Sequence, residues 1–393
     1  MRSRRGPLTG ITIVELTGIG PAPYAAMLLA DLGARVIRID RPGGYPALGP
    51  GLDFEKMEAA SVFYRSRPLV RVDLKSEAGR ALLLRLVGEA DALIEGYRPG
   101  TMERLGLGPE ECHAVNPALA YVRVTGWGQD GPRALTAGHD LNYIGLSGAL
   151  SLFGRDGVPP RGVPPLIGDM AGGALFAVIG LLSAVLHARA SGEGQVVDAA
   201  ITDGSASLYS LLTALAAMGA HDPRGGVNVL DGGRHYYRTY ACADGQHIAV
   251  GAIEPAFRKV LLEKLGLMGD PRFLSGAPED ESHCTQLLTA LFRSKPRAHW
   301  VALFEGTDGC VTPVLSLTEA PQDAHNRARG SFVEIDDIPQ PAPAPRFAAT
   351  PGVVSRSPAE AGRADPVALA DWGLTRDEIE TLVARGTVEP GQG

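Results

Sequence analysis

The sequence predicts an α/β protein with two domains: a large Rossmann-like domain built on a mostly parallel sheet, and a small α+β domain. In the first 130 residues, short apolar strand patterns alternate with helix patterns, as in βαβ units. After about residue 225 the pattern changes to a hairpin followed by a helix. We therefore expect a large domain over 1–225, a small domain over 226–324, and a return of 325–393 to the large domain.

Five segments of the large domain have the apolar character of buried strands. They are residues 11–16, 35–40, 69–74, 91–95 and 121–125. Helix patterns cover 24–32 and 76–89, and a loop rich in Gly and Pro covers 41–53. Pro21 stands where the first helix begins, because its missing N–H is not needed there, and Gly33 ends that helix.

The small domain begins with a predicted hairpin. Its strands are 234–242 and 247–252, and the turn between them contains Asp244-Gly245. A helix is expected over 255–265. The stretch 339–345 alternates Pro with Gln or Ala, so we expect an extended segment that leads back to the large domain.

The composition excludes several classes of protein. Of 393 residues, 45% are hydrophobic and 21% charged, which is typical of a globular chain rather than a disordered one. The 37 Lys+Arg and 44 Asp+Glu give a net charge of −7, which argues against nucleic-acid binding through a basic face. The four cysteines are scattered without a CxxC pair, so we expect no zinc site, no disulfide framework and a reducing compartment, the cytoplasm.

One charge-free apolar run, 170–186, resembles a membrane span in composition. It is shorter than the ~20 residues that a spanning helix needs. We expect a buried core helix and no membrane span.

The first strand–turn–helix unit is also compared with a dinucleotide-binding motif. Asp40 ends the second strand, where a ribose-binding acid is expected. However, Pro23 stands in place of the third glycine, and Pro21 removes an N–H near the pyrophosphate position. This argues against nicotinamide or flavin binding.

Arginines follow two of the predicted strands. They are Arg38 and Arg41 beside the second strand, and Arg98 and Arg104 after the fourth. Because the carboxyl ends of parallel strands meet at one edge of a sheet, these guanidinium groups are candidates for a phosphorylated ligand. The alternative is a set of solvated surface charges.

His139 and Asp169 are the candidate bases. Asp140 is expected to cap a helix over 141–153 that Gly154 stops, which places His139 at a helix start and favours the neutral imidazole. Asp169 is expected at the head of the apolar helix, followed by two glycines that permit close approach. Each side chain has a purely structural alternative as a cap or packing group. Together they suit proton abstraction beside a thioester carbonyl. Glu254 either caps the helix over 255–265 or reaches this pocket.

With these residues in view, the chain resembles the α-methylacyl-CoA racemases, a branch of the family III CoA-transferase superfamily. The resemblance covers nearly the whole chain in collinear order. The matching stretches are 7–16, 31–34, 38–42, 72–75, 95–100, 125–132, 138–140, 168–169, 194–199, 250–254 and 311–314.

The resemblance implies an interlocked homodimer whose active site lies between the large domain of one subunit and the small domain of the other. It implies an acyl-CoA substrate and no metal or organic cofactor. His139 is then one base, oriented by Asp140 and Glu254, and Asp169 is the opposite base. Arg38, Arg41, Arg98 and Arg104 are candidates for the CoA nucleotide.

Three functions remain open at this point. The first is a racemase that interconverts (R)- and (S)-2-methylacyl-CoA thioesters in lipid and fatty acid metabolism. The second is a CoA-transferase, in which Asp169 forms an acyl-enzyme anhydride; the Gly138-His139-Asp140 element argues for the racemase. The third is a non-catalytic acyl-CoA-binding protein.

Overall fold

The computed structural model describes residues 5–44, 61–155 and 157–391, and the chain divides into two compact units. The first unit is Met1–Ser147, Val163–Tyr209 and Gly330–Gly393, and the second is Gly148–Gly162 and Ser210–Arg329. The change of unit thus falls at residue 209 rather than at the predicted 225, and the return at 330 rather than 325. Helix α9 (Ser210–Ala217) buries none of its residues, so its side chains do not anchor it in the core of the sheet.

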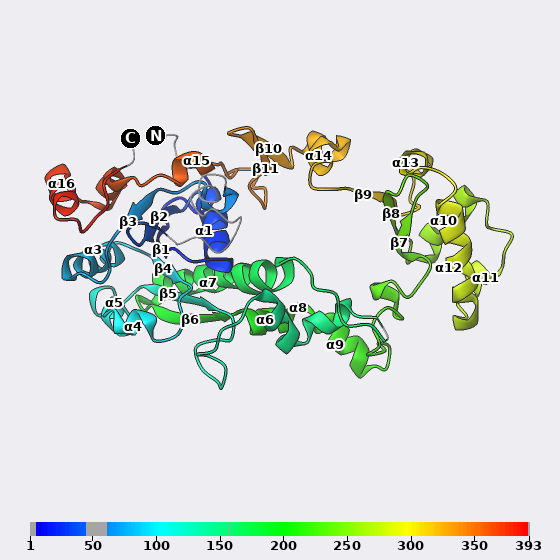
Figure 1. The fold of residues 1–393 in the computed structure, drawn as a ribbon, viewed down its shortest axis with the longest axis horizontal. Coiled ribbons are helices and arrows are strands. Elements are labelled where there is room, and N and C mark those ends of the chain that lie inside the picture. The colour runs from blue at the N-terminus through cyan, green and yellow to red at the C-terminus, as the bar shows by residue number, and fades with distance from the viewer. Residues whose placement is uncertain (1–4, 45–60, 156, 392–393) are drawn as a thin grey trace. The chain divides into compact units, whose positions relative to one another are not determined.

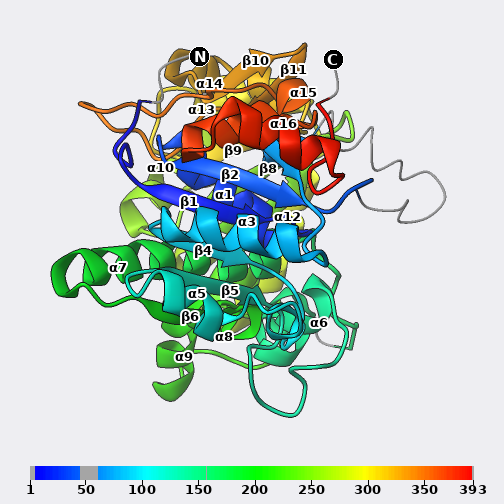
Figure 2. The same ribbon diagram turned by 90° about the vertical axis from the view of Figure 1, so that its left-hand side faces the viewer.

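A six-stranded parallel sheet forms the centre of the first unit (Figure 2). Its strands are β1 (Thr12–Leu16), β2 (Arg35–Asp40), β3 (Leu69–Arg71), β4 (Ala92–Glu95), β5 (Ala120–Thr125) and β6 (Gln195–Ala200). Their order, β3-β2-β1-β4-β5-β6, is that of a Rossmann fold. The predicted parallel α/β sheet is confirmed.

Two strands differ from the prediction. β3 ends at Arg71 rather than at residue 74, and Val72 instead forms a bridge with Val388 of the C-terminal segment. The sequence analysis did not place β6, because only the last two residues of this edge strand are buried and its apolar pattern is weak.

Helices cover both faces of the sheet. One face packs against α3, α4, α5, α16 and the 3₁₀ segment Pro366–Trp372, and the other against α1 and α7. Among the described residues, the helices of this unit are α1 (Pro21–Asp31), α3 (Glu77–Gly88), α4 (Thr101–Arg104), α5 (Pro109–Val115), α6 (Asp140–Ser147), α7 (Phe176–Ser191), α8 (Ile201–Leu208), α15 (Pro358–Ala361) and α16 (Arg376–Ala384). The hairpin of β10 (Phe332–Ile335) and β11 (Ile338–Pro341) also belongs to it. The C-terminal segment therefore completes a core that the N-terminal segment begins.

The predicted apolar helix is longer than expected. A π-helical segment, Leu166–Leu175, runs directly into α7, and together they form a 26-residue apolar helix. By length and composition this is the one helix of the described residues that would suffice to cross a membrane, which is weak evidence for a span. Ala177, Leu181 and Ala184 pack into the core beneath β4 and β5.

The second unit contains a three-stranded antiparallel sheet, β7 (Tyr237–Ala241), β8 (His247–Gly251) and β9 (Val311–Val314). The predicted hairpin and the helix α10 (Pro255–Leu265) are confirmed. Figure 1 shows α10 and α12 beside these strands. The remaining helices of this unit are α11 (Arg272–Ser275), α12 (Pro278–Phe292), α13 (Arg297–Phe304) and α14 (Ala324–Arg329). Of the predicted loop 41–53, residues 45–53 lie outside the described residues.

Candidate active site

One hydrogen bond joins the two segments that carry the predicted bases. The backbone N–H of Asp169, in the π-helical segment, donates to Asp140 Oδ1 of α6 at 2.7 Å. A Cβ atom on Gly168 would lie 2.4 Å from the same oxygen, so the approach requires glycine. His139 directly precedes Asp140. The two candidate bases therefore stand on adjoining backbone segments of one unit.

The predicted role of Asp140 as an N-cap is wrong. Helix α6 begins at Asp140 itself, and the carbonyl of His139 accepts hydrogen bonds from the N–H groups of Asn142 and Tyr143. The Asp140 carboxylate instead accepts from the π-helical segment. Burial raises the pKa of Asp140 above its ordinary value, although the N–H groups of Asp169 and Gly168 oppose this.

The predicted helix over 141–153 is also shorter than expected. α6 ends at Ser147, and Gly148 breaks the helix with φ +94°, a conformation that favours glycine. A separate 3₁₀ turn, Ala149–Phe153, follows.

The carboxylate of Asp169 lies against the turn between β1 and α1. A Cβ atom on Gly20 would lie 2.9 Å from Asp169 Oδ2, and Gly20 has φ +84°. Both facts require glycine there. Burial, and then the charge of Asp140, raise the pKa of Asp169 to about 6. Asp169 is therefore mostly ionised at neutral pH and is a stronger base than an ordinary aspartate. Asp169 was predicted to stand at the head of the apolar helix. It lies instead within the π-helical segment, which begins at Leu166.

The side chain of His139 is exposed. Its backbone N–H donates to Asn142 Oδ1 at 3.1 Å, which closes the first turn of α6. His139 thus lies at a helix start, as expected, with its ring accessible to a ligand.

Tyr143 connects these elements, and the sequence analysis did not single it out. Its hydroxyl donates to the carbonyl of Gly138, and its ring meets Trp127 edge-on with 4.7 Å between ring centroids. A Cβ atom on Gly126 or Gly138 would overlap the ring, at 2.0 and 2.7 Å. In the sequence, Gly126, Gly128 and Gly138 indicate that something approaches the backbone closely here. They do not indicate which aromatic ring does so.

Two charged groups near Tyr143 affect the pKa of its hydroxyl. Burial, and then the charge of Asp169, raise the pKa of Tyr143, whereas the charge of Arg98 lowers it. The Arg98 guanidinium and the Asp169 carboxylate therefore both act on the same hydroxyl.

The chain matches one of the known protein families over most of its length. The model of CoA-transferase family III matches residues 8–367. The chain belongs to CoA-transferase family III.

Individual relatives are similar over nearly the full length. The alpha-methylacyl-CoA racemase of Homo sapiens is 40% identical over 386 residues, 97% of each chain, and that of Mus musculus is 40% identical over 387 residues, also 97% of each. The succinyl-CoA–D-citramalate CoA-transferase of Chloroflexus aurantiacus is 30% identical over 97% of this chain and 98% of its own. The crystal structure of a CAIB/BAIF family protein from Brucella suis superposes with a TM-score of 0.79 at 28% identity and covers 94% of this chain and 100% of that one. These likenesses confirm the resemblance and the fold class.

In this member of CoA-transferase family III the four candidate arginines differ in accessibility. Arg41, Arg98 and Arg104 are exposed. Arg38 is fully buried: its Nη2 donates to the carbonyl of Ala361 at 3.2 Å, and its guanidinium lies 3.8 Å from the centre of the Tyr64 ring. A nucleotide contact by Arg38 would require it to leave these partners.

Glu254 belongs to the second unit. It is exposed and precedes α10, where its side chain makes no capping hydrogen bond. Burial, and then the charges of Glu254 and Asp308, raise the pKa of Cys310, so Glu254 lies near this half-buried thiol.

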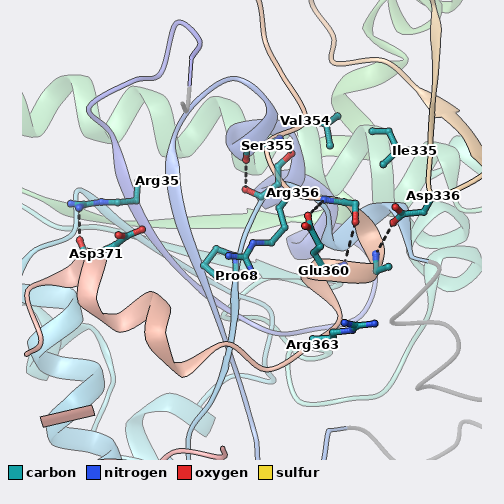
Figure 3. A pocket seen from close by; sticks show the side chains of 13 residues that line it. Arg35, Pro68, Ile335, Asp336, Val354, Ser355, Arg356, Glu360, Arg363 and Asp371 are labelled. Atoms are coloured by element: carbon teal, nitrogen blue, oxygen red, sulfur yellow. Dashed lines mark hydrogen bonds between the residues drawn. The ribbon is translucent and has the colours of Figure 1, made fainter. Parts of the chain in front are cut away.

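A cavity of about 970 Å³ in the first unit is a separate feature (Figure 3). Arg35 at the start of β2 and Pro68 just before β3 line it, together with the C-terminal segment around Arg356. It therefore lies at the amino ends of these strands, the edge opposite to the one where parallel sheets bind ligands. None of the candidate residues lines it. Over 5–44, 61–155 and 157–391, no group of three or more His, Cys, Asp and Glu side chains is arranged to hold a metal ion.

Proposed function

We propose that this protein is a 2-methylacyl-CoA racemase that works by 1,1-proton transfer. The observation that carries the proposal is the hydrogen bond from the Asp169 N–H to Asp140, which holds the segments of the two bases together. The 40% identity with two alpha-methylacyl-CoA racemases supports it.

The mechanism uses one base for each epimer. His139 removes the α-proton of one epimer, and the electrons of the C–H bond form an enolate. Protonated Asp169 then delivers a proton to the opposite face of the carbon, which inverts it. In the reverse direction the Asp169 carboxylate removes the proton and the His139 imidazolium returns one. The N–H groups of Asp140 and Leu141, which precede the two N–H groups that bind the His139 carbonyl, are the candidates to stabilise the enolate oxygen.

The CoA moiety provides the binding energy in this proposal. We assign the contacts with its phosphates to Arg41, Arg98 and Arg104, whose exposed guanidinium groups offer planar pairs of donors. The reaction needs no metal or organic cofactor, because the thioester itself acidifies the α-carbon.

We further propose a homodimer with the active site between subunits. The 26-residue apolar helix Leu166–Ser191 supports this, because Leu175, Ile179 and Leu186 recur on one helix face and are 43, 59 and 70% exposed. Such a face is typical of a protein interface. Glu254 would then reach His139 from the second subunit. Sedimentation velocity should give a dimer, and a monomer that is active would contradict this arrangement.

We place the enzyme in lipid and fatty acid metabolism in the cytoplasm. All four cysteines are free thiols, which fits a reducing compartment.

The alternative is a CoA-transferase that moves CoA between carboxylic acids through an Asp169 acyl anhydride. The 30% identity with a CoA-transferase over nearly the whole chain supports this alternative. It requires an acceptor acid, and hydroxylamine should then cleave the anhydride and leave either Asp169 or the released acyl group as a hydroxamate.

Incubation of one 2-methylacyl-CoA epimer in D₂O tests the proposal. We expect both epimers and deuterium at the α-carbon, without any acceptor acid. His139→Ala and Asp169→Asn should each lower the rate by about 10²–10⁴-fold. His325→Ala, a change of an exposed histidine in the second unit, is the matched control and should leave the rate unchanged.

CoA binding without exchange or racemisation by the folded protein would identify a non-catalytic binding protein. Exchange of CoA that depends on an added acid, without racemisation, would identify the transferase.

A further inference from the structure

Arg123 stands on β5 directly beside the end of β4. Its register partner in the parallel sheet is Glu95, the last residue of β4. Arg123 Nε donates to Glu95 Oε1 at 3.0 Å. The two terminal nitrogens of Arg123 donate to the two carboxylate oxygens of Glu103 at 2.8 and 3.2 Å. One guanidinium therefore binds two carboxylates from different elements.

The two carboxylates bracket the loop that carries the proposed CoA contacts. Glu95 ends β4, Glu103 lies in the short helix α4, and Arg98 lies between them. Arg104 directly follows Glu103. The second oxygen of Glu95 accepts from the N–H of Tyr97 at 2.6 Å, which ties down the start of the loop. Arg123 thus connects both ends of a loop that contains the exposed Arg98 and is followed directly by the exposed Arg104.

Burial and charge distinguish the three members of this cluster. The side chains of Arg123 and Glu95 are 8 and 0% exposed, and that of Glu103 is 44% exposed. Burial raises the pKa of Glu95 to about 7, against the opposing hydrogen bonds from Tyr97 and Arg123. Burial by itself would also raise the pKa of Glu103. The hydrogen bonds from Arg123 outweigh this effect and hold the pKa of Glu103 below its ordinary value. Glu103 is therefore the charged partner at neutral pH, and Glu95 is the buried acceptor.

We propose that Arg123 is a positioning residue for CoA binding: it holds the loop between Glu95 and Glu103 so that Arg98 and Arg104 face the CoA phosphates. This inference rests on the proposed function, which assigns CoA to these arginines. The planar fork of Arg123 satisfies three hydrogen bonds in fixed directions, which a lysine ammonium does not reproduce. Arg123 itself is buried, and its guanidinium is bound to the two carboxylates.

The test measures KM and kcat for a 2-methylacyl-CoA, and the dissociation constant of CoA itself by calorimetry. The variants are Arg123→Lys, Arg123→Met, Arg98→Ala and the double variant Arg98→Ala/Arg123→Met. Arg85→Met is the matched control, because Arg85 also binds a carboxylate, Glu378 of α16, but in an exposed pair that includes no residue of this loop. If Arg123→Met does not fold, Glu103→Gln removes the charged partner at a half-exposed position.

Arg123→Met is expected to raise KM and the CoA dissociation constant by about tenfold, with kcat changed less than about twofold, as loss of a charged hydrogen-bonded anchor predicts. Arg123→Lys and Glu103→Gln should give smaller rises in the same quantities. The loss of CoA affinity in the double variant should be smaller than the sum of the two single losses, because part of the Arg123 effect acts through Arg98 and only the part that acts through Arg104 remains. The control should match the unmodified enzyme.

Four results would overturn the inference. If Arg98→Ala weakens CoA binding but the Arg123 and Glu103 variants do not, Arg123 has no positioning role. If the two losses add in the double variant, Arg123 acts independently of Arg98. If kcat falls as much as kcat/KM, the change is general damage to the fold. If Arg98→Ala and an Arg104→Ala variant leave CoA binding unchanged, the CoA assignment in the proposed function fails, and this inference fails with it.

Discussion

The contact between Gly168 and Asp140 gives the sharpest structural prediction. In Gly168→Ala the new Cβ atom would lie 2.4 Å from Asp140 Oδ1 and 2.9 Å from a methyl carbon of Ile144. Since real Cβ contacts begin at 3.0–3.4 Å, the Asp140 carboxylate and the segment of Gly168 must move apart by about 0.6–1.0 Å. That displacement breaks or lengthens the hydrogen bond between Asp140 and Asp169 and moves one base away from the other.

A displacement of about 1 Å in a reacting group costs up to about 10²-fold in rate, so we expect kcat to fall by about 10- to 100-fold. Overpacking should lower the free energy of unfolding by about 1–3 kcal/mol. The affinity for CoA should change little, because Arg41, Arg98 and Arg104 lie outside the two segments that carry Gly168 and Asp140. The measurements are the rate of epimer interconversion, the dissociation constant of CoA and urea denaturation.

Gly88→Ala in α3 is the matched control. A Cβ atom there meets no atom within 4 Å, and the residue lies in a regular helix. We expect unchanged kcat and equal or slightly higher stability. If Gly168→Ala kept the kcat of the unmodified enzyme while remaining folded, the coupling of the two bases through this contact would be refuted.

Asp169, Tyr143 and Arg65 each allow a further test. In the direction in which Asp169 is the base, the rate should rise with pH up to about 6, because only the ionised carboxylate accepts a proton. Since burial raises the pKa of Asp169, its contribution to stability should fall as pH rises from about 4 to about 6. Asp169→Asn should remove both effects, as rate profiles and denaturation against pH would show. Tyr143→Phe keeps the ring but removes the hydrogen bond to Gly138, so we expect a loss of about 1 kcal/mol in stability and a kcat lower by about fivefold, measured by denaturation and kinetics. Arg65→Met leaves the buried carboxylate of Asp31 without its cation, and urea denaturation should show a loss of about 3–5 kcal/mol with no change in CoA affinity of the folded fraction.

The site was predictable where local chemistry marks it. His139 and Asp169 stand beside glycines, and the structure shows why: Gly168 and Gly20 leave room for carboxylates, and Gly138 leaves room for the Tyr143 ring. The role of Asp140 was not predictable in the same way. A capping residue is normally recognised by its own helix, whereas Asp140 accepts from a segment 29 positions further along the chain.

The amino-acid sequence by itself determined the elements of this protein, since helix and strand periodicities record which side of each segment is buried. The strand Arg35–Asp40 and the helix Pro255–Leu265 were placed to the residue in this way. Tertiary structure alone decided which partners the polar groups find. It placed Arg38 inside against Tyr64 and left Arg98 exposed, and it set Arg123 between two carboxylates. Periodicity carries no information on such pairs, because they join residues whose separation along the chain has no period.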